Sequence, residues 1–370
     1  MNAIDPAPVR SILIRANNWI GDVVMIAPAV RAIRERFAGA RIAIVARPWV
    51  VRTLRGNPYY DDLIEYDSGG RHHGARGVLR LARELRPARY DLAILFQKAF
   101  EAAALAFLAG ARMRAGYPTD GRRFLLTHAV PLPPPETHHA EAFLGIARAL
   151  GCVIRDPRPF FFLAPETRRR AAAILDFARL PAGRPLVALH PGASKPPRAW
   201  HAHRFARLGR TLIEQAGGSI ILIGGREDRA LLAEIARHIP ARSLFTLPDD
   251  LAVEETAAVL ERCRLFVGND SGPMHIAAAL GVPVVGIFGP GSPRRTAPIA
   301  AAGLLEIVGK DYPCAPCRQD FFRECPPSPA GKPFCLEEIS VDEVIRPALR
   351  LLSLPLPRAP GAGRSPESSR

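Results

Sequence analysis

The sequence predicts an α/β protein made of two doubly wound parallel-sheet domains, and three observations support this. The chain has 370 residues, which is too long for a typical single domain. Short apolar strands alternate with helical segments in the first half, and the same alternation starts again in the second half. Two proline-rich stretches, 131–135 and 156–165, lie between the halves. We place the first domain at 1–160 and the second at 161–354.

In the first half, apolar runs and helical spacing locate the elements. Ile20, Val23, Val24, Ala27 and Val30 recur at the spacing of one helix face, which predicts a helix over 20–37. Further helices are expected at 75–85, 100–108 and 138–150. Strands are expected at 9–15, 41–46, 62–66, 90–96 and 113–116.

The second half repeats this order. Strands are expected at 185–190, 219–223, 265–268 and 282–288, and helices at 203–215, 226–238, 253–263 and 273–280. A closing helix ends this domain. Residues 355–370 are rich in Pro, Gly, Ser and Arg and are expected to form a disordered tail.

The net charge of +15 favours anionic partners: nucleic acid, acidic lipid headgroups or phosphorylated substrates. An arginine-rich composition spread over the whole chain explains the charge equally well. No dense basic block interleaved with aromatic residues occurs, nor does a zinc-finger, RRM or KH signature, so no nucleic-acid partner is expected.

The sequence also predicts a cytoplasmic, monomeric protein that can touch a membrane surface electrostatically. The apolar stretch 11–20 is broken by Arg15 and followed by Asp22, so it makes no secretory signal. The run 271–293 is long and apolar, but glycines and prolines interrupt it. It reads as helix, turn, buried strand and turn rather than as a membrane span.

The loop after the first strand carries a candidate catalytic carboxylate, Asp22, at the start of a helix. Gly21 permits close backbone approach, and Asn17 and Asn18 offer hydrogen-bond donors and turn geometry. An Asp in a first helical turn is commonly a residue that favours the helix start through the dipole. It can also act as the general base that removes a proton from an attacking sugar hydroxyl, and the two roles are compatible.

Three loops in the second half have features of a diphosphate site. The segment 190–195 (HPGASK) includes Gly192, Ser194 and Lys195, and leads to Arg198 and Trp200; it offers backbone N–H groups and positive charge, or it is a plain strand–helix turn.

The segment 268–275 (GNDSGPMH) is the second of these loops. Ser271 or Gly272 fits the N-cap and Pro273 fits the first helical position, so the helix start faces the sheet edge. Asp270 binds sugar hydroxyls, braces the loop or is a second capping acid.

The third loop, 224–228 (GGRED), carries Glu227, which accepts hydrogen bonds from a ribose diol or is a helix-starting acid. Because all three loops follow strands of one domain, a nucleotide-diphosphate site is predicted there.

Together these motifs resemble glycosyltransferase family 9, the heptosyltransferases. The segments ILIRANNWIGDVVMIAPAVRAIRERF, HPGASKPPRAW, IGGREDRALLAEIA and GNDSGPMHIAAALGVPVVGIFGP occur in the family's order, and the resemblance extends to about Leu352. The segment YDLAILFQKAFEAAALAFLAGARMRAGY is similar to the heptosyltransferase II branch. The resemblance implies the GT-B fold, in which two Rossmann-like domains face each other across a cleft.

The resemblance also implies an activity in lipopolysaccharide core biosynthesis. The donor would be ADP-heptose and the acceptor a heptosylated, Kdo-bearing lipid A core at the inner membrane surface, with inversion and without a metal. Asp22 matches the family's base, and Asn17, Asn18, Trp19 and Gly21 belong to its acceptor segment. The donor segment is matched by Asp270, Ser271, Gly272, Pro273, Met274 and His275, and the ribose contact by Glu227. Arg198 stands close to Lys195, at a position where the family often has Lys, and a guanidinium serves phosphate at least as well.

Cys314, Cys317, Cys325 and Cys335 cluster within a loop at 312–335. A Cys-Ala-Pro-Cys knuckle followed by two further thiols is typical of a structural zinc site, and reduced thiols or redox pairing are the alternatives.

Other functions fit parts of the pattern. A heptosyltransferase I or III, a protein heptosyltransferase or another nucleotide-sugar transferase would share most motifs. A nucleotide-sugar epimerase shares the architecture but would leave the Asp22 loop without a purpose. A non-catalytic basic protein that binds carbohydrate or nucleic acid would show steep salt dependence and no donor turnover.

Overall fold

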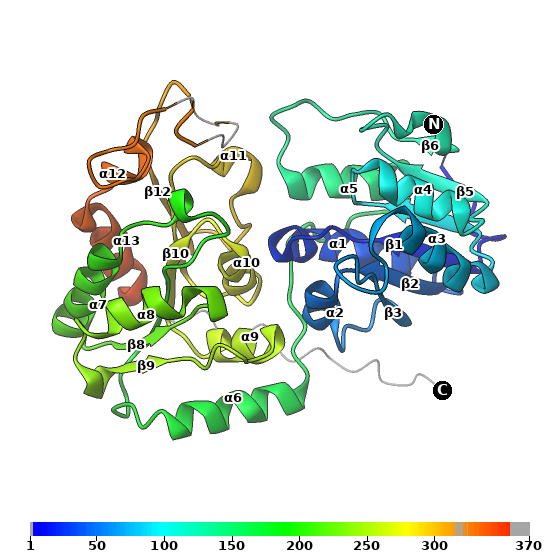
Figure 1. Cartoon of the computed structure of the whole chain (residues 1–370). Helices are drawn as coiled ribbons and strands as arrows, with labels where there is room; N and C mark the ends of the chain where they lie inside the picture. The colour runs from blue at the N-terminus through cyan, green and yellow to red at the C-terminus, as the bar shows by residue number, and fades with distance from the viewer. Residues whose placement is uncertain (1–2, 315–316, 318–320, 324, 356–370) are drawn as a thin grey trace. The chain divides into compact units, whose positions relative to one another are not determined.

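The computed structural model describes residues 3–314, 317, 321–323 and 325–355 (Figure 1). The chain divides into two compact units. Unit 1 comprises Met1–Ala171, Ala252–Ala258 and Ser292–Pro298, and unit 2 comprises Ala172–Leu251, Val259–Gly291 and Ile299–Arg370. Each unit contains one six-stranded sheet.

The sheet of unit 1 is entirely parallel, with strand order β3-β2-β1-β4-β5-β6. Its central strands are almost continuously apolar because helices cover both faces. The strands are β1 (Ser11–Arg15), β2 (Arg41–Ala46), β3 (Asp62–Glu65), β4 (Leu92–Leu95), β5 (Met113–Gly116) and β6 (His128–Ala129).

Two helices of unit 1, α3 and α4, cover one face of this sheet. They bury Leu81, Leu85 and Ala106 against Leu13 and Val45 of the strands. Right-handed crossovers place α1 and α2 on the other face, and α5 packs against α1. The helices that begin in this unit are α1 (Ile20–Arg36), α2 (Pro48–Leu54), α3 (Gly74–Leu85), η1 (Arg86–Ala88), α4 (Phe100–Leu108), η2 (Arg122–Leu125), α5 (His139–Ala149) and α6 (Pro165–Phe177).

The sheet of unit 2 is also parallel, with strand order β12-β11-β10-β7-β8-β9. The strands are β7 (Leu186–His190), β8 (Ser219–Leu222), β9 (Leu244–Thr246), β10 (Leu265–Asn269), β11 (Val284–Phe288) and β12 (Leu305–Gly309).

The last helix, α13, closes the core of unit 2 by packing against α7. Ser340 and Glu343 form a capping box at its start, which satisfies backbone N–H groups that a helix otherwise leaves open. The indole Nε1 of the buried Trp200 donates to the Ile339 carbonyl oxygen at 3.0 Å, just before α13.

The second half contains η3 (Pro196–Arg198), α7 (Ala202–Ala216), η4 (Arg226–Asp228), α8 (Arg229–Ala236), η5 (Ala241–Ser243), α9 (Val253–Glu261), α10 (Gly272–Ala279), α11 (Pro293–Thr296), α12 (Phe334–Glu337) and α13 (Val341–Ser353).

The predicted fold class is confirmed: both halves form doubly wound parallel sheets. The predicted bounds of β2, β5 and α4 coincide with the structure, and most other predicted elements differ by a few residues. The predicted helix 226–238 was wrong at its start, where a 3-10 turn, η4, precedes α8. The elements α2, β6, α6, β9, β12, α11 and α12 were not predicted. Of the predicted tail, 356–370 lie outside the described residues.

Within the described part of the chain, no helix combines the length and the apolar character that crossing a bilayer requires.

Candidate functional site

Each sheet contains one point at which the order of its strands reverses. In unit 1 this point lies between β1 and β4, and in unit 2 between β7 and β10. Ligands of doubly wound sheets bind beyond the carboxyl ends of the strands at such a point, because neighbouring loops diverge there and leave a crevice. The predicted loops after β1, β7 and β10 all start at these points.

Asp22 is the third residue of α1, where the positive end of the helix dipole favours a carboxylate. Its side chain is 17% exposed, so one side stays open to a ligand. Asn17 Nδ2 donates to Asp22 Oδ2 at 3.3 Å, and His139 Nδ1 lies 3.4 Å from Asp22 Oδ1. Two elements other than α1 therefore orient this carboxylate.

Lys98 adds a cation to the same region, from the loop after β4. Burial lowers the pKa of Lys98, while attraction to Asp22 acts in the opposite direction. The Lys98 carbonyl oxygen accepts a hydrogen bond from Thr119 Oγ1 at 2.7 Å, which fixes the loop. Neither Lys98 nor His139 was predicted. For Lys98 a signal existed, since it follows the strand that pairs with β1.

A buried arginine supports the loop that precedes Asp22. The Arg15 side chain is 1% exposed, and its Nη2 donates to Asn18 Oδ1 at 3.0 Å. Its guanidinium lies 3.8 Å from the Glu101 carboxylate and 5.2 Å from the centroid of the Tyr66 ring. Burial lowers the pKa of Arg15 to about 10. Trp49 Nε1 donates to the Asn18 carbonyl oxygen at 2.8 Å.

The predicted acceptor residues therefore differ in their surroundings. Asn18 is engaged by Arg15 and Trp49, whereas the Trp19 side chain is 67% exposed and available to a ligand. Asn17 Oδ1 is buried without a hydrogen-bond partner among the described residues. A role of Asn17, Asn18, Trp19 and Gly21 in acceptor binding stays a prediction.

In unit 2, Gly192 leaves space for a carboxylate from the next loop. A Cβ atom at Gly192 would lie 2.4 Å from Asp228 Oδ2. The same oxygen accepts a hydrogen bond from the Gly225 amide at 3.0 Å. Asp228, which was not predicted, thus joins the loop after β7 to the loop after β8.

Asn269 holds the loop after β7 against β10. Its side chain is fully buried; Oδ1 accepts from the Trp200 amide at 3.1 Å, and Nδ2 donates to the Pro191 carbonyl oxygen at 2.8 Å. Gly268 allows the strands to approach, since a Cβ atom there would lie 2.9 Å from the His190 carbonyl oxygen. The Gly-Asn pair of the predicted motif therefore builds the site and need not touch a ligand.

Arg198 and Asp270 form an ion pair across the switch point of unit 2. Arg198 Nη2 contacts Asp270 Oδ2 and lies 3.3 Å from the Asp270 carbonyl oxygen. Arg198 Nη1 donates to Ser194 Oγ at 3.3 Å. The carboxylate beside a predicted anion site is thus neutralised by this guanidinium. Lys195 is exposed, and its Nζ lies 5.6 Å from the centroid of the Phe321 ring.

The start of α10 presents backbone N–H groups, as the motif predicts. Ser271 is the N-cap residue, and its side chain makes no capping hydrogen bond because Oγ donates to the Asn269 carbonyl oxygen at 2.9 Å. Gly272 and Pro273 open the helix, one position later than the prediction for Pro273. Unoccupied N–H groups at a helix start bind anions.

Two predicted donor residues are buried. Met274 is fully buried, and a Cβ atom at Gly286 would lie 2.8 Å from its sulfur, so its side chain is part of the core. His275 is 6% exposed. Met274 can meet a donor only through its backbone. Glu227 is exposed in η4, beside Gly225, and its role as the ribose contact stays a prediction.

A zinc site at the four clustered cysteines stays a prediction. Cys335 is buried in α12, whereas Cys314 is exposed. Burial, and then the neighbouring thiols of Cys314, Cys317 and Cys325, raise the pKa of Cys335 to about 11. All four cysteines are described, and the described residues contain no group of three or more His, Cys, Asp or Glu side chains that could hold a metal ion.

Comparison with known proteins identifies the family and supports the fold. The family model of glycosyltransferase family 9 (heptosyltransferase) matches residues 78–325. The lipopolysaccharide heptosyltransferase 2 of Salmonella typhimurium is 30% identical over 314 residues, which are 80% of this chain and 88% of that protein.

Two solved structures share the fold. The family 9 glycosyltransferase from Veillonella parvula has a TM-score of 0.81 at 24% identity, covering 95% of this chain and 99% of that one. The ADP-heptose lps heptosyltransferase II of Escherichia coli has a TM-score of 0.75 at 23% identity, covering 92% and 98%. The chain therefore belongs to glycosyltransferase family 9, the heptosyltransferase family, and is a glycosyltransferase of GT-B fold.

Proposed function

We propose that this enzyme transfers a heptose from ADP-heptose to the heptosylated, Kdo-bearing lipid A core of lipopolysaccharide. The acceptor class follows the name of the Salmonella relative, lipopolysaccharide heptosyltransferase 2. The donor follows the name of the Escherichia coli enzyme, ADP-heptose lps heptosyltransferase II.

The observation that carries the proposal is the placement of Asp22. Its half-buried carboxylate lies at the switch point of unit 1, oriented by Asn17 and His139. In the reaction the acceptor hydroxyl oxygen forms a bond to the anomeric carbon and gives its proton to Asp22. The bond from that carbon to the ADP oxygen breaks, and ADP leaves with the electron pair. Attack from the side opposite ADP inverts the anomeric configuration.

Unit 2 supplies what a diphosphate leaving group needs. The start of α10 offers backbone N–H groups, Lys195 offers positive charge, and Arg198 neutralises Asp270 beside them. These groups can stabilise the negative charge that develops on ADP, and the proposal therefore includes no catalytic metal. In this proposal Gly192 and Ser194 of the same loop also contact the donor, and Glu227 accepts hydrogen bonds from the ribose.

The proposal extends to the setting of the reaction. We place the enzyme as a monomer on the cytoplasmic side of the inner membrane, where a soluble nucleotide sugar meets a lipid-linked acceptor. No nucleic-acid partner is included.

The test is heptose transfer by purified protein from ADP-heptose to a heptosylated core acceptor. Asp22→Asn should lower kcat by roughly 10²–10⁴-fold and leave the Kd for ADP unchanged. Asp176→Asn, at an exposed carboxylate of α6, is the matched control and should keep full activity. EDTA should not change the rate.

Near-normal transfer by the Asp22→Asn variant would refute the base assignment. Donor epimerisation without transfer, or loss of activity in EDTA with recovery on added magnesium, would refute the reaction as proposed.

A further inference from the structure

The solvent-facing side of α3 and α4 in unit 1 combines exposed apolar side chains with arginines. We call it the α3–α4 surface. Its apolar members are Leu79, Phe100, Phe107, Leu108 and Phe124, and its basic members are Arg76, Arg80, Arg83 and Arg123.

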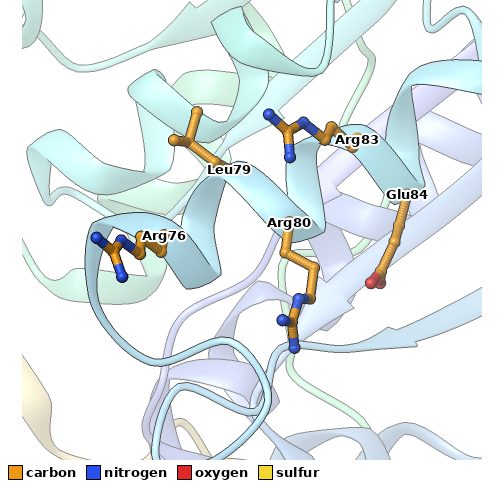
Figure 2. Close-up of a pocket in the computed structure, with 5 residues that line it drawn as sticks. All are labelled: Arg76, Leu79, Arg80, Arg83 and Glu84. Atoms are coloured by element: carbon orange, nitrogen blue, oxygen red, sulfur yellow. The ribbon is translucent and has the colours of Figure 1, made fainter.

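Helix α3 presents its basic residues on one face. Arg76, Arg80 and Arg83 project from the helix around Leu79, and with Glu84 they line a hollow (Figure 2). The residues at 77, 81, 82 and 85 are buried on the opposite face against the sheet. Because i, i+4 and i+7 share one face of a helix, the three guanidinium groups point away from the core.

Helix α4 presents apolar residues in the same way. Phe100 and Phe107 lie two turns apart on its outer face, and Phe107 is 52% exposed. Phe124, from η2, is 73% exposed, and its ring centroid lies 6.1 Å from that of Phe100. Since α3 and α4 cover the same face of the sheet, their outer faces form one continuous surface.

The carboxylates near this surface are already engaged. Glu84 pairs with Arg71 at 2.5 Å. Asp120 accepts a hydrogen bond from the Phe100 amide at 2.6 Å, and Glu101 lies 3.8 Å from the buried Arg15. Across the described ranges, no carboxylate forms an ion pair with Arg76, Arg80, Arg83 or Arg123. The surface therefore has positive charge that an anionic partner can neutralise.

The chemistry of this surface matches the interface of an anionic bilayer. Arginines bind lipid phosphates, and each basic residue near an anionic membrane strengthens binding by roughly fivefold. Phenylalanine rings enter the boundary between headgroups and acyl chains. The surface also adjoins the Asp22 site within unit 1, because Lys98 and Phe100 are two residues apart in the loop that begins α4.

We propose that the α3–α4 surface docks this enzyme onto an anionic phospholipid bilayer. The arginines meet headgroup phosphates, and Phe107, Phe124 and Leu79 enter the interface. The proposal rests on the proposed function in one respect: a lipid surface is chosen as the partner because the proposed acceptor is lipid-linked. It names the face through which a lipid-linked acceptor reaches Asp22.

Vesicle co-sedimentation tests the proposal. The wild-type protein should bind phosphatidylglycerol-rich vesicles, release them as salt is raised, and bind phosphatidylcholine vesicles weakly. The triple variant Arg76→Gln, Arg80→Gln, Arg83→Gln should lose roughly a hundredfold in partitioning, as three fivefold steps predict. Salt screens the attraction of the arginines, so the binding that remains at high salt depends on the apolar side chains. Phe107→Ser combined with Phe124→Ser should weaken this remaining binding.

Matched controls come from unit 2. Arg210→Gln, Arg237→Gln, Arg242→Gln removes the same charge from exposed positions, and Phe177→Ser removes a ring that is even more exposed than Phe107 and Phe124. Both should bind vesicles within about twofold of wild type. A larger loss in these controls would mean that net charge alone explains the weaker binding of the surface variants. Circular dichroism confirms that each variant is folded.

Several outcomes would overturn the proposal: surface variants that sediment like wild type, equal binding to both kinds of vesicle, or surface variants that only turn a dimer into a monomer. A water-soluble deacylated acceptor separates this proposal from the proposed function. If docking is correct, the surface variants keep transfer to that acceptor and lose transfer on vesicles. If wild-type protein binds vesicles but transfers to neither acceptor, the proposed function fails and docking stands.

Discussion

His139 Nδ1 lies 3.4 Å from Asp22 Oδ1, although 117 residues separate the two along the chain. Asp22 lies in the first turn of α1 and His139 begins α5, and the two helices pack against each other in unit 1. Phe143, one turn further along α5, meets the imidazole edge-on with a ring-centroid distance of 6.2 Å. Packing of α5 on α1 therefore fixes the histidine beside the carboxylate.

We expect His139→Ala to lower kcat for transfer by roughly tenfold, because a hydrogen bond to a charged group is worth about 1.5 kcal/mol. His139→Gln keeps a donor near the carboxylate and should recover part of the loss. Only a group that shares a proton with Asp22 should also alter the pH dependence of kcat. The measurement is a pH–rate profile for the three proteins, with His73→Ala, at an exposed histidine, as control.

An unchanged pH–rate profile in His139→Ala would show that the histidine only fills space. Equal losses in Ala and Gln variants would show that the imidazole ring itself is required.

Lys98→Met should make the protein more stable and less active. Burial lowers the pKa of Lys98 in the folded state. The ammonium group therefore costs stability as long as Lys98 is protonated in both the folded and the unfolded protein. That cost is complete at neutral pH. It disappears as pH rises through the folded-state pKa towards the ordinary value of 10.5. The stabilising effect of Lys98→Met should follow the same course.

The measurement is Tm of wild type and Lys98→Met at neutral pH and near pH 10, each paired with a transfer assay. Transfer should fall about tenfold or more, because a cation that can bind an acceptor oxygen or phosphate has been removed. A lower Tm for the variant at neutral pH would contradict the assigned cost of burial.

Helical and strand periodicity predicted the central elements because they are buried on a regular face. Strand β2 is buried from Ile42 onward, and α4 alternates buried and exposed positions at helical spacing. The edge strands β9 and β12 were missed because they are short and mostly only half-buried, although most of their residues are apolar. Helix α6 was missed although Ala171, Ile174 and Leu175 stand at helical spacing, and of its residues only Ala171 is buried.

The residues of the candidate site, too, could be predicted only in part. The positions of Asp22, Asp270 and the 190–195 loop follow from their place after parallel strands, which a sequence reveals. The partners Lys98, His139 and Asp228 depend on which helices and strands pack together. A single sequence does not contain that information in its local pattern. The cysteine spacing predicts zinc, and the structure adds only that Cys335 is buried in α12 while Cys314 is at the surface.

Arg198→Lys should weaken ADP binding by roughly tenfold, or about 1.4 kcal/mol. One guanidinium contacts both Ser194 and Asp270, and an ammonium group cannot span these two partners in the same plane. The measurement is titration calorimetry with ADP. Arg210→Lys, at an exposed position of α7, is the control and should bind ADP like wild type. Equal affinity in both variants would show that Arg198 contributes charge alone.

Gly192 and Asp228 approach each other closely and so join two donor loops. A Cβ atom at Gly192 would lie 2.4 Å from Asp228 Oδ2, so Gly192→Ala must displace that carboxylate and its hydrogen bond to the Gly225 amide. We expect Gly192→Ala to weaken ADP binding at least tenfold. In an Asp228→Ala background the same substitution should cost much less, because the steric conflict is gone.

A double-mutant cycle on the Kd for ADP measures this coupling. Gly183→Ala, at a glycine with open space around it and a φ of +74°, provides a glycine substitution outside the donor loops. It should lower Tm through backbone strain and leave ADP binding unchanged. If Gly192→Ala costs the same with and without Asp228, the two loops act independently, and the pyrophosphate site does not depend on their contact.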